Sequence, residues 1–177
     1  MTFRFYISVL TVLAAFATAP AAFAISNGEP VSSTSWIAKS TVAIFYRRNS
    51  ISERCTGTIL SKNSILTAAH CFSGRTEPEK LLAYHVLFGV DVSQAAFEIV
   101  SNGKTAKSNR VKDIGIEAVI PSATEIAAGT SGDLAIIKLK KKIPRGYRSG
   151  TRSARRAESQ TPYTMAGYGL ENTGIMS

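Results

Sequence analysis

Cysteine and histidine are both scarce in this sequence, with two of each among 177 residues. Neither a C-x-x-C nor an H-x-x-x-H pair occurs, although a structural metal site uses about four such ligands. The sequence also has no internal repeat, no heptad pattern and no long amphipathic helix. These absences argue against a domain stabilised by a structural metal ion, against a repeat protein and against a coiled coil. Many short β-prone runs separated by polar turns remain, and they favour an antiparallel barrel or sandwich.

Acidic residues are also few, at 12 against 21 Lys and Arg, which gives a formal net charge of +9. Much of the excess lies between 138 and 156, where nine of nineteen residues are basic and none is acidic. Such a stretch is typical of either a solvated connection or a surface that binds a polyanion. Aromatic side chains, which would favour nucleic acid, are nearly absent there. The nine residues are Lys138, Lys140, Lys141, Lys142, Arg145, Arg148, Arg152, Arg155 and Arg156.

The first 24 residues have the pattern of a secretory signal peptide. Arg4 precedes an almost uncharged apolar run over 5–19, and Ala22-Phe23-Ala24 is a small-x-small cleavage sequence. The apolar run is short for a membrane span. We therefore predict a secreted or periplasmic protein whose mature chain begins at Ile25 and has no stable membrane span. In an oxidising compartment, an even cysteine count is most simply a disulfide between Cys55 and Cys71.

Both cysteines bound one stretch, CTGTILSKNSILTAAHC, with His70 directly before the second. Two β-prone runs flank the turn-forming Ser-Lys-Asn at 61–63, which predicts a hairpin that ends in a turn presenting His70. A disulfide would hold that histidine rigidly, as a general base requires. A metal site or a thiol nucleophile fits less well, because other ligands are lacking and Cys71 has an obvious partner.

TAAHC, with a cysteine sixteen positions before its own, resembles the histidine segment of trypsin/chymotrypsin-like serine peptidases. The resemblance implies that His70 is the general base. It also implies that Asp133, which opens Asp-Leu-Ala-Ile-Ile-Lys-Leu, is the carboxylate that orients it. Asp91 and Asp113 are weaker alternatives because both lie in polar surroundings. We expect His85 to lie on a strand and to contribute to solvation or packing.

The family's Gly-Asp-Ser-Gly-Gly nucleophile segment does not occur in the 177 residues. Ser131 lies in a superficially similar sequence, but that sequence directly precedes the aspartate strand, whereas the family serine lies well downstream of the aspartate. Ile25 begins an Ile-x-x-Gly sequence that resembles an activated N-terminus. We thus expect a C-terminally truncated peptidase chain, inactive alone and without metal or cofactor, whose substrates as a family are proteins or peptides. The alternatives are a chain completed by a separate one and a secreted non-catalytic binding protein that uses the basic stretch.

The resemblance implies an all-β fold, an antiparallel barrel of the trypsin-like type. It places the first barrel at 25–143, a basic inter-barrel connection at 144–160 and the start of a second barrel at 161–177. We expect Leu134–Ile137 to form a strand buried on both faces, and Glu29–Lys39 and Ser73–Glu79 to be loops. Strands are expected over Thr41–Tyr46, both arms of the hairpin, Leu81–Val90, Phe97–Val100 and Val111–Ile120.

Overall fold

The computed structural model describes residues 30–48, 51–102, 110–122, 132–151 and 164–168. Its strands form one sheet in the order β5-β4-β1-β2-β3-β7-β6, and every neighbouring pair is antiparallel. The strands are β1 (Thr41–Arg48), β2 (Ile51–Ser61), β3 (Ser64–Thr67), β4 (Tyr84–Phe88), β5 (Lys112–Ile114), β6 (Ile116–Pro121) and β7 (Ala135–Leu139).

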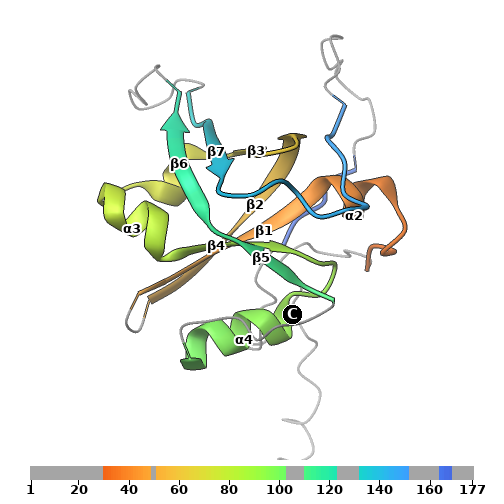
Figure 1. The fold of residues 1–177 in the computed structure, drawn as a ribbon, viewed down its shortest axis with the longest axis horizontal. Coiled ribbons are helices and arrows are strands. Elements are labelled where there is room, and N and C mark those ends of the chain that lie inside the picture. The colour runs from red at the N-terminus through yellow and green to blue at the C-terminus, as the bar shows by residue number, and fades with distance from the viewer. Residues whose placement is uncertain (1–29, 49–50, 103–109, 123–131, 152–163, 169–177) are drawn as a thin grey trace, which may run out of the picture.

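The sheet is curled, and its connectivity explains why. β5 and β6 occupy its two ends, yet only Gly115 separates them in the chain. A single residue cannot cross a flat sheet of this width, because the chain advances at most about 3.6 Å per residue. The two ends therefore approach each other, as the adjacent β5 and β6 in Figure 1 show. This half-barrel confirms the predicted all-β antiparallel fold.

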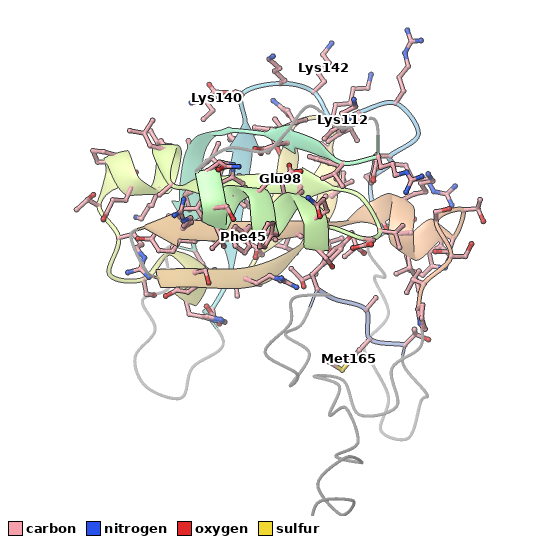
Figure 2. All side chains as sticks on the ribbon, turned by 90° about the horizontal axis from the view of Figure 1, so that it is seen from below. Phe45, Glu98, Lys112, Lys140, Lys142 and Met165 are labelled. Atoms are coloured by element: carbon pink, nitrogen blue, oxygen red, sulfur yellow. A yellow bond between two sulfur atoms is a disulfide. The ribbon has the colours of Figure 1, made fainter. Side chains whose placement is uncertain are left out.

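The inside of the curl holds the main core, to which all seven strands contribute. Side chains alternate along β1, so that Val42, Ile44 and Tyr46 enter this core. Ala43 and Phe45 point to the opposite face, where they form a second cluster. The helix α4 (Ser93–Asn102) covers that second cluster, as Figure 2 shows for Glu98 and Phe45. The two clusters thus lie on opposite faces of the sheet.

The predicted strand at Phe97–Val100 was wrong, because these residues belong to α4. β-branched Ile99 and Val100 favoured a strand, but tertiary packing decided otherwise. Val92, Ala95, Ala96 and Ile99 are all buried and recur at helical spacing. That i, i+3, i+4, i+7 pattern is the signal that identifies the helix in the sequence.

Two predicted loops also contain helices. The stretch 29–39 includes most of α2 (Trp36–Ser40), whose first turn is capped by the Ser35 side chain accepting from the Ala38 N–H. The stretch 73–79 runs into α3 (Glu77–Leu82), where the Glu79 carboxylate accepts from the N–H of Thr76. Thr-x-x-Glu is a capping-box sequence, so this helix start was readable in the sequence.

β7 begins at Ala135 and is buried on one face, not on both. Leu134 precedes it and is 51% exposed, while Ala135, Ile137 and Leu139 enter the main core. A short apolar run can arise from an edge of the core as well as from a fully buried strand, which is why the prediction failed.

Candidate active site

The pairing of β3 with β7 brings His70 and Asp133 together across 63 positions of sequence. Thr67, the last residue of β3, pairs with Ala135, the first residue of β7. His70 follows Thr67 by three residues, in the 3-10 helix η1 (Ala69–Phe72). Asp133 precedes Ala135 by two residues, so the two side chains emerge at the same end of the strand pair.

His70 binds both carboxylate oxygens of Asp133. Its backbone N–H donates to Oδ1 at 2.8 Å, and its ring Nδ1 lies 2.5 Å from Oδ2. A carboxylate oxygen accepts, so the ring proton belongs on Nδ1. In the neutral imidazole Nε2 is then unprotonated and able to accept a proton.

These two hydrogen bonds, the one from the imidazole first, lower the pKa of Asp133 below its ordinary value. The pair is open to solvent, with 67% of the His70 side chain and 43% of the Asp133 side chain exposed. Asp133 therefore lies before β7, at an exposed end of the strand pair, and not inside the strand. Donors from His70, rather than burial, hold the carboxylate in place.

The backbone next to His70 is fixed from two directions. Cys71 forms a disulfide with Cys55 on β2, which ties η1 to the sheet. The hydroxyl of Tyr84, on β4, donates to the carbonyl oxygen of Cys71 at 2.5 Å. The ring of Phe72 packs against that of Tyr84 at 4.6 Å between centroids. The His70 side chain thus projects into solvent from a backbone that is held rigidly.

Tyr84 is itself held in an aromatic and ionic network. Its ring lies 4.7 Å from that of Tyr46, and the guanidinium of Arg75 stacks on Tyr46 at 4.3 Å. Arg75 also donates to the Glu53 carboxylate at 2.6 Å. Burial raises the pKa of Tyr84 to about 12, so its hydroxyl keeps its proton and donates throughout the physiological range.

Tyr84→Phe is expected to lower the free energy of unfolding by about 1–3 kcal/mol, because the carbonyl of Cys71 loses its donor in a buried setting. Urea denaturation measures the change. Tyr147→Phe is the matched control, since no hydrogen bond of the Tyr147 hydroxyl is found among the described residues, and it should cost much less. Equal losses in both variants would contradict the role given to the Tyr84 hydroxyl.

Of the other candidates, His85 and Asp113 form a second pair. His85 Nδ1 on β4 lies 2.7 Å from Asp113 Oδ2 on the neighbouring β5. Asp91 instead accepts from the N–H of Ser93 at the start of α4, which lowers its pKa. His85 lies on a strand as expected, but its partner was missed, because the register of β4 and β5 is not visible in the sequence.

Cys55, His70 and Cys71 place possible metal-ligand atoms within 4.8 Å of one another. The two sulfurs are bonded to each other, so neither offers the thiolate that a metal site uses. The residues of this cluster in their oxidised form do not fit a metal. Ile25, Ser131, Arg152, Arg155 and Arg156 lie outside the described residues.

Comparison with known proteins adds to this geometry. The family model for trypsin matches residues 25–176. The chain belongs to the trypsin family. A search of curated proteins finds no match. Among solved structures, one titled "Structure of GrC" is 22% identical, with a TM-score of 0.52 over 75% of this chain and 50% of that one. This trypsin-family chain thus spans about half the length of that structure, and the likeness shows a shared fold.

Proposed function

We propose that this trypsin-family chain supplies the general base and its orienting carboxylate to a serine endopeptidase. The observation that supports this most strongly is the double hydrogen bond between His70 and Asp133. It holds the imidazole in the tautomer whose Nε2 can take a proton. The disulfide and the Tyr84 hydroxyl support the proposal further, because they limit the motion of the backbone beside His70.

In the proposed reaction, a serine Oγ attacks the carbonyl carbon of a peptide bond while its proton passes to Nε2 of His70. Asp133 stabilises the imidazolium that forms. The imidazolium then protonates the leaving amine nitrogen as the C–N bond breaks, which leaves an acyl-enzyme. Water repeats the sequence, with its proton taken by Nε2, and releases the acid. Asp133 keeps its negative charge throughout, consistent with its lowered pKa.

The nucleophilic serine segment is not part of the 177 residues, so we propose that these residues alone do not turn over peptides. A chromogenic peptide ester should be hydrolysed no faster by the chain than by its His70→Ala variant. A His70-dependent activity that a sulfonyl fluoride abolishes would overturn this proposal and reveal another nucleophile. We further propose that the DNA beyond the codon for Ser177 encodes Gly-Asp-Ser-Gly-Gly in one of its frames, which sequencing tests directly.

We also propose that residues 1–24 are a signal peptide and that the secreted chain begins at Ile25. We likewise propose that residues 25–143 form the first barrel, that 144–160 form the connection between barrels and that 161–177 begin the second barrel. None of the helices in the described part of the chain is both long and apolar enough to cross a membrane. After expression with export, N-terminal sequencing should read Ile-Ser-Asn-Gly. A product that keeps its first residues would contradict this proposal.

A further inference from the structure

The basic segment that follows β7 is held against the half-barrel by backbone hydrogen bonds and does not extend freely into solvent. We call residues 139–150, which begin at the last residue of β7, the basic strap. Its backbone N–H groups donate to carbonyls of three separate elements, which fixes its path from the β2–β3 turn to α2 (Figure 1). The bonds are Leu139 N to Asn63 O at 3.0 Å, Ile143 N to Lys62 O at 2.8 Å, Arg148 N to Lys39 O at 2.9 Å and Gly150 N to Ile59 O at 2.8 Å.

Apolar anchors set which way the strap faces. Ile143 and Tyr147 pack against the main core, and the Tyr147 ring meets Phe88 edge-on at 5.1 Å between centroids. Between these anchors the chain turns at Gly146, whose φ of +89° is one that glycine adopts without strain. The three lysines at 140–142 lie between Leu139 in the core and Ile143 packed against it, Arg145 lies between Ile143 and Tyr147, and all four of these basic side chains are exposed.

That outer face is cationic. Five basic side chains of the strap are exposed, and Lys62, whose carbonyl oxygen accepts a hydrogen bond from the strap, is also exposed. Lys138 does not join them, because its Nζ donates to the Ser64 hydroxyl at 3.1 Å. Figure 2 shows Lys140 and Lys142 projecting on the same side of the molecule as Lys112. The five are Lys140, Lys141, Lys142, Arg145 and Arg148.

We propose that the outer face of the basic strap binds a linear sulfated polysaccharide. Closely spaced cations attract a polyanion and release its counterions. Because the backbone is already fixed, less chain entropy is lost on binding than for a disordered basic segment. The surface is independent of His70 and Asp133, and it needs none of the basic residues beyond Thr151.

Two other polyanions fit the strap less well. Proteins that bind single-stranded nucleic acid stack its bases on exposed aromatic rings. The only aromatic side chain of the strap is Tyr147, whose ring packs against Phe88 and is covered by the Lys39 ammonium group. A membrane surface is bound by cations together with apolar side chains that enter the lipid. In the strap the large apolar side chains Leu139 and Ile143 pack inward. A sulfated chain requires charge alone.

The test is retention of the 177-residue chain on immobilised heparin, with binding also measured across a series of salt concentrations. We expect elution only above about 0.3 M salt, where the Debye length is below about 6 Å and weak long-range attraction is largely screened. Replacing Lys140, Lys141 and Lys142 by Ala should reduce the slope of log K against log salt by about 2–3. Elution of the parent chain at low salt would overturn the proposal.

The control is a variant with the same loss of net charge on α4, at the opposite face of the sheet: Gln94→Glu, Ser101→Glu and Asn102→Asp. It should lower the slope by less than about 1. An equal reduction of the slope in both variants would mean that heparin binding depends on net charge alone and not on the strap. If the lysine triple fails to fold by circular dichroism, Arg145→Gln with Arg148→Gln replaces it, with an expected reduction of about 1.5–2.

Two competing probes separate the polysaccharide from other polyanions. A single-stranded oligonucleotide and vesicles containing about one-third phosphatidylserine are compared with heparin at equal salt and equal anionic charge. We expect heparin to bind most tightly. Tighter binding of the oligonucleotide or the vesicles would overturn the assignment to a sulfated polysaccharide. Hydrolytic activity enters none of these readouts, so failure here leaves the proposed catalytic pair unaffected.

Discussion

Asp133→Asn is expected to lower kcat for peptide-ester hydrolysis about 10⁴-fold, in a form of the protein that also carries the nucleophilic serine segment. The loss corresponds to roughly 5.5 kcal/mol of transition-state stabilisation. Asp133 accepts from both the backbone N–H and Nδ1 of His70. An asparagine amide can present N–H to Nδ1, which moves the ring proton to Nε2 and leaves no base for the serine. The imidazolium also loses its neighbouring charge.

The second histidine–aspartate pair provides a matched control for this prediction. Asp113→Asn makes the same chemical change beside His85, at a similar distance of 2.7 Å. It should leave kcat within about twofold of the parent value, because the His85–Asp113 pair on β4 and β5 shares no residue with the His70–Asp133 pair. Comparable losses in both variants would indicate general damage to the fold and would contradict the assigned role of Asp133.

Loss of the disulfide is expected to lower the free energy of unfolding by about 3 kcal/mol. The bond closes a loop of sequence separation 16, and its removal restores loop-closure entropy to the unfolded chain. Cys55→Ala with Cys71→Ala tests this by urea denaturation. Because Cys71 is buried, the double variant also loses packing.

The parent chain under reducing conditions separates the two contributions, because it keeps both sulfur atoms and lacks only the bond. Its loss of stability should account for most of the loss in the double variant. A reduced chain as stable as the oxidised one would contradict the structural role of the bond. The same comparison reports on the site, since η1 carries His70 directly beside Cys71.

The part of the fold that could be predicted is the part fixed by local pattern. The hairpin of β2 and β3 follows from turn residues at 61–63 between two β-prone runs. α4 was not predicted, because the β-branched residues Ile99 and Val100 favour a strand while the spacing of Ala95 and Ile99 favours a helix. The helical spacing is visible in the sequence. The packing that stabilises the helix is not, because it involves Leu87 and Phe45 from distant strands.

The candidate site divides in the same way. His70 and Asp133 were indicated by their sequence segments, and the pairing of β3 with β7 brings them within hydrogen-bonding distance. Their exposure was not predictable, because it depends on what covers the end of the strand pair. The hydrogen bond from Tyr84 to the carbonyl of Cys71 was also beyond prediction, since a phenol contacting a carbonyl 13 residues away leaves no pattern in the sequence.

The most direct test of the account is nuclear magnetic resonance of the chain with ¹⁵N-labelled histidine, at a pH where the imidazoles are neutral. With two histidines in the sequence, His85→Gln assigns the signals. We predict that Nδ1 of His70 carries the proton and that Nε2 does not, with a low-field proton signal that Asp133→Asn removes. A proton on Nε2 in the parent chain would contradict the account, because the nitrogen proposed to accept the serine proton would already be occupied.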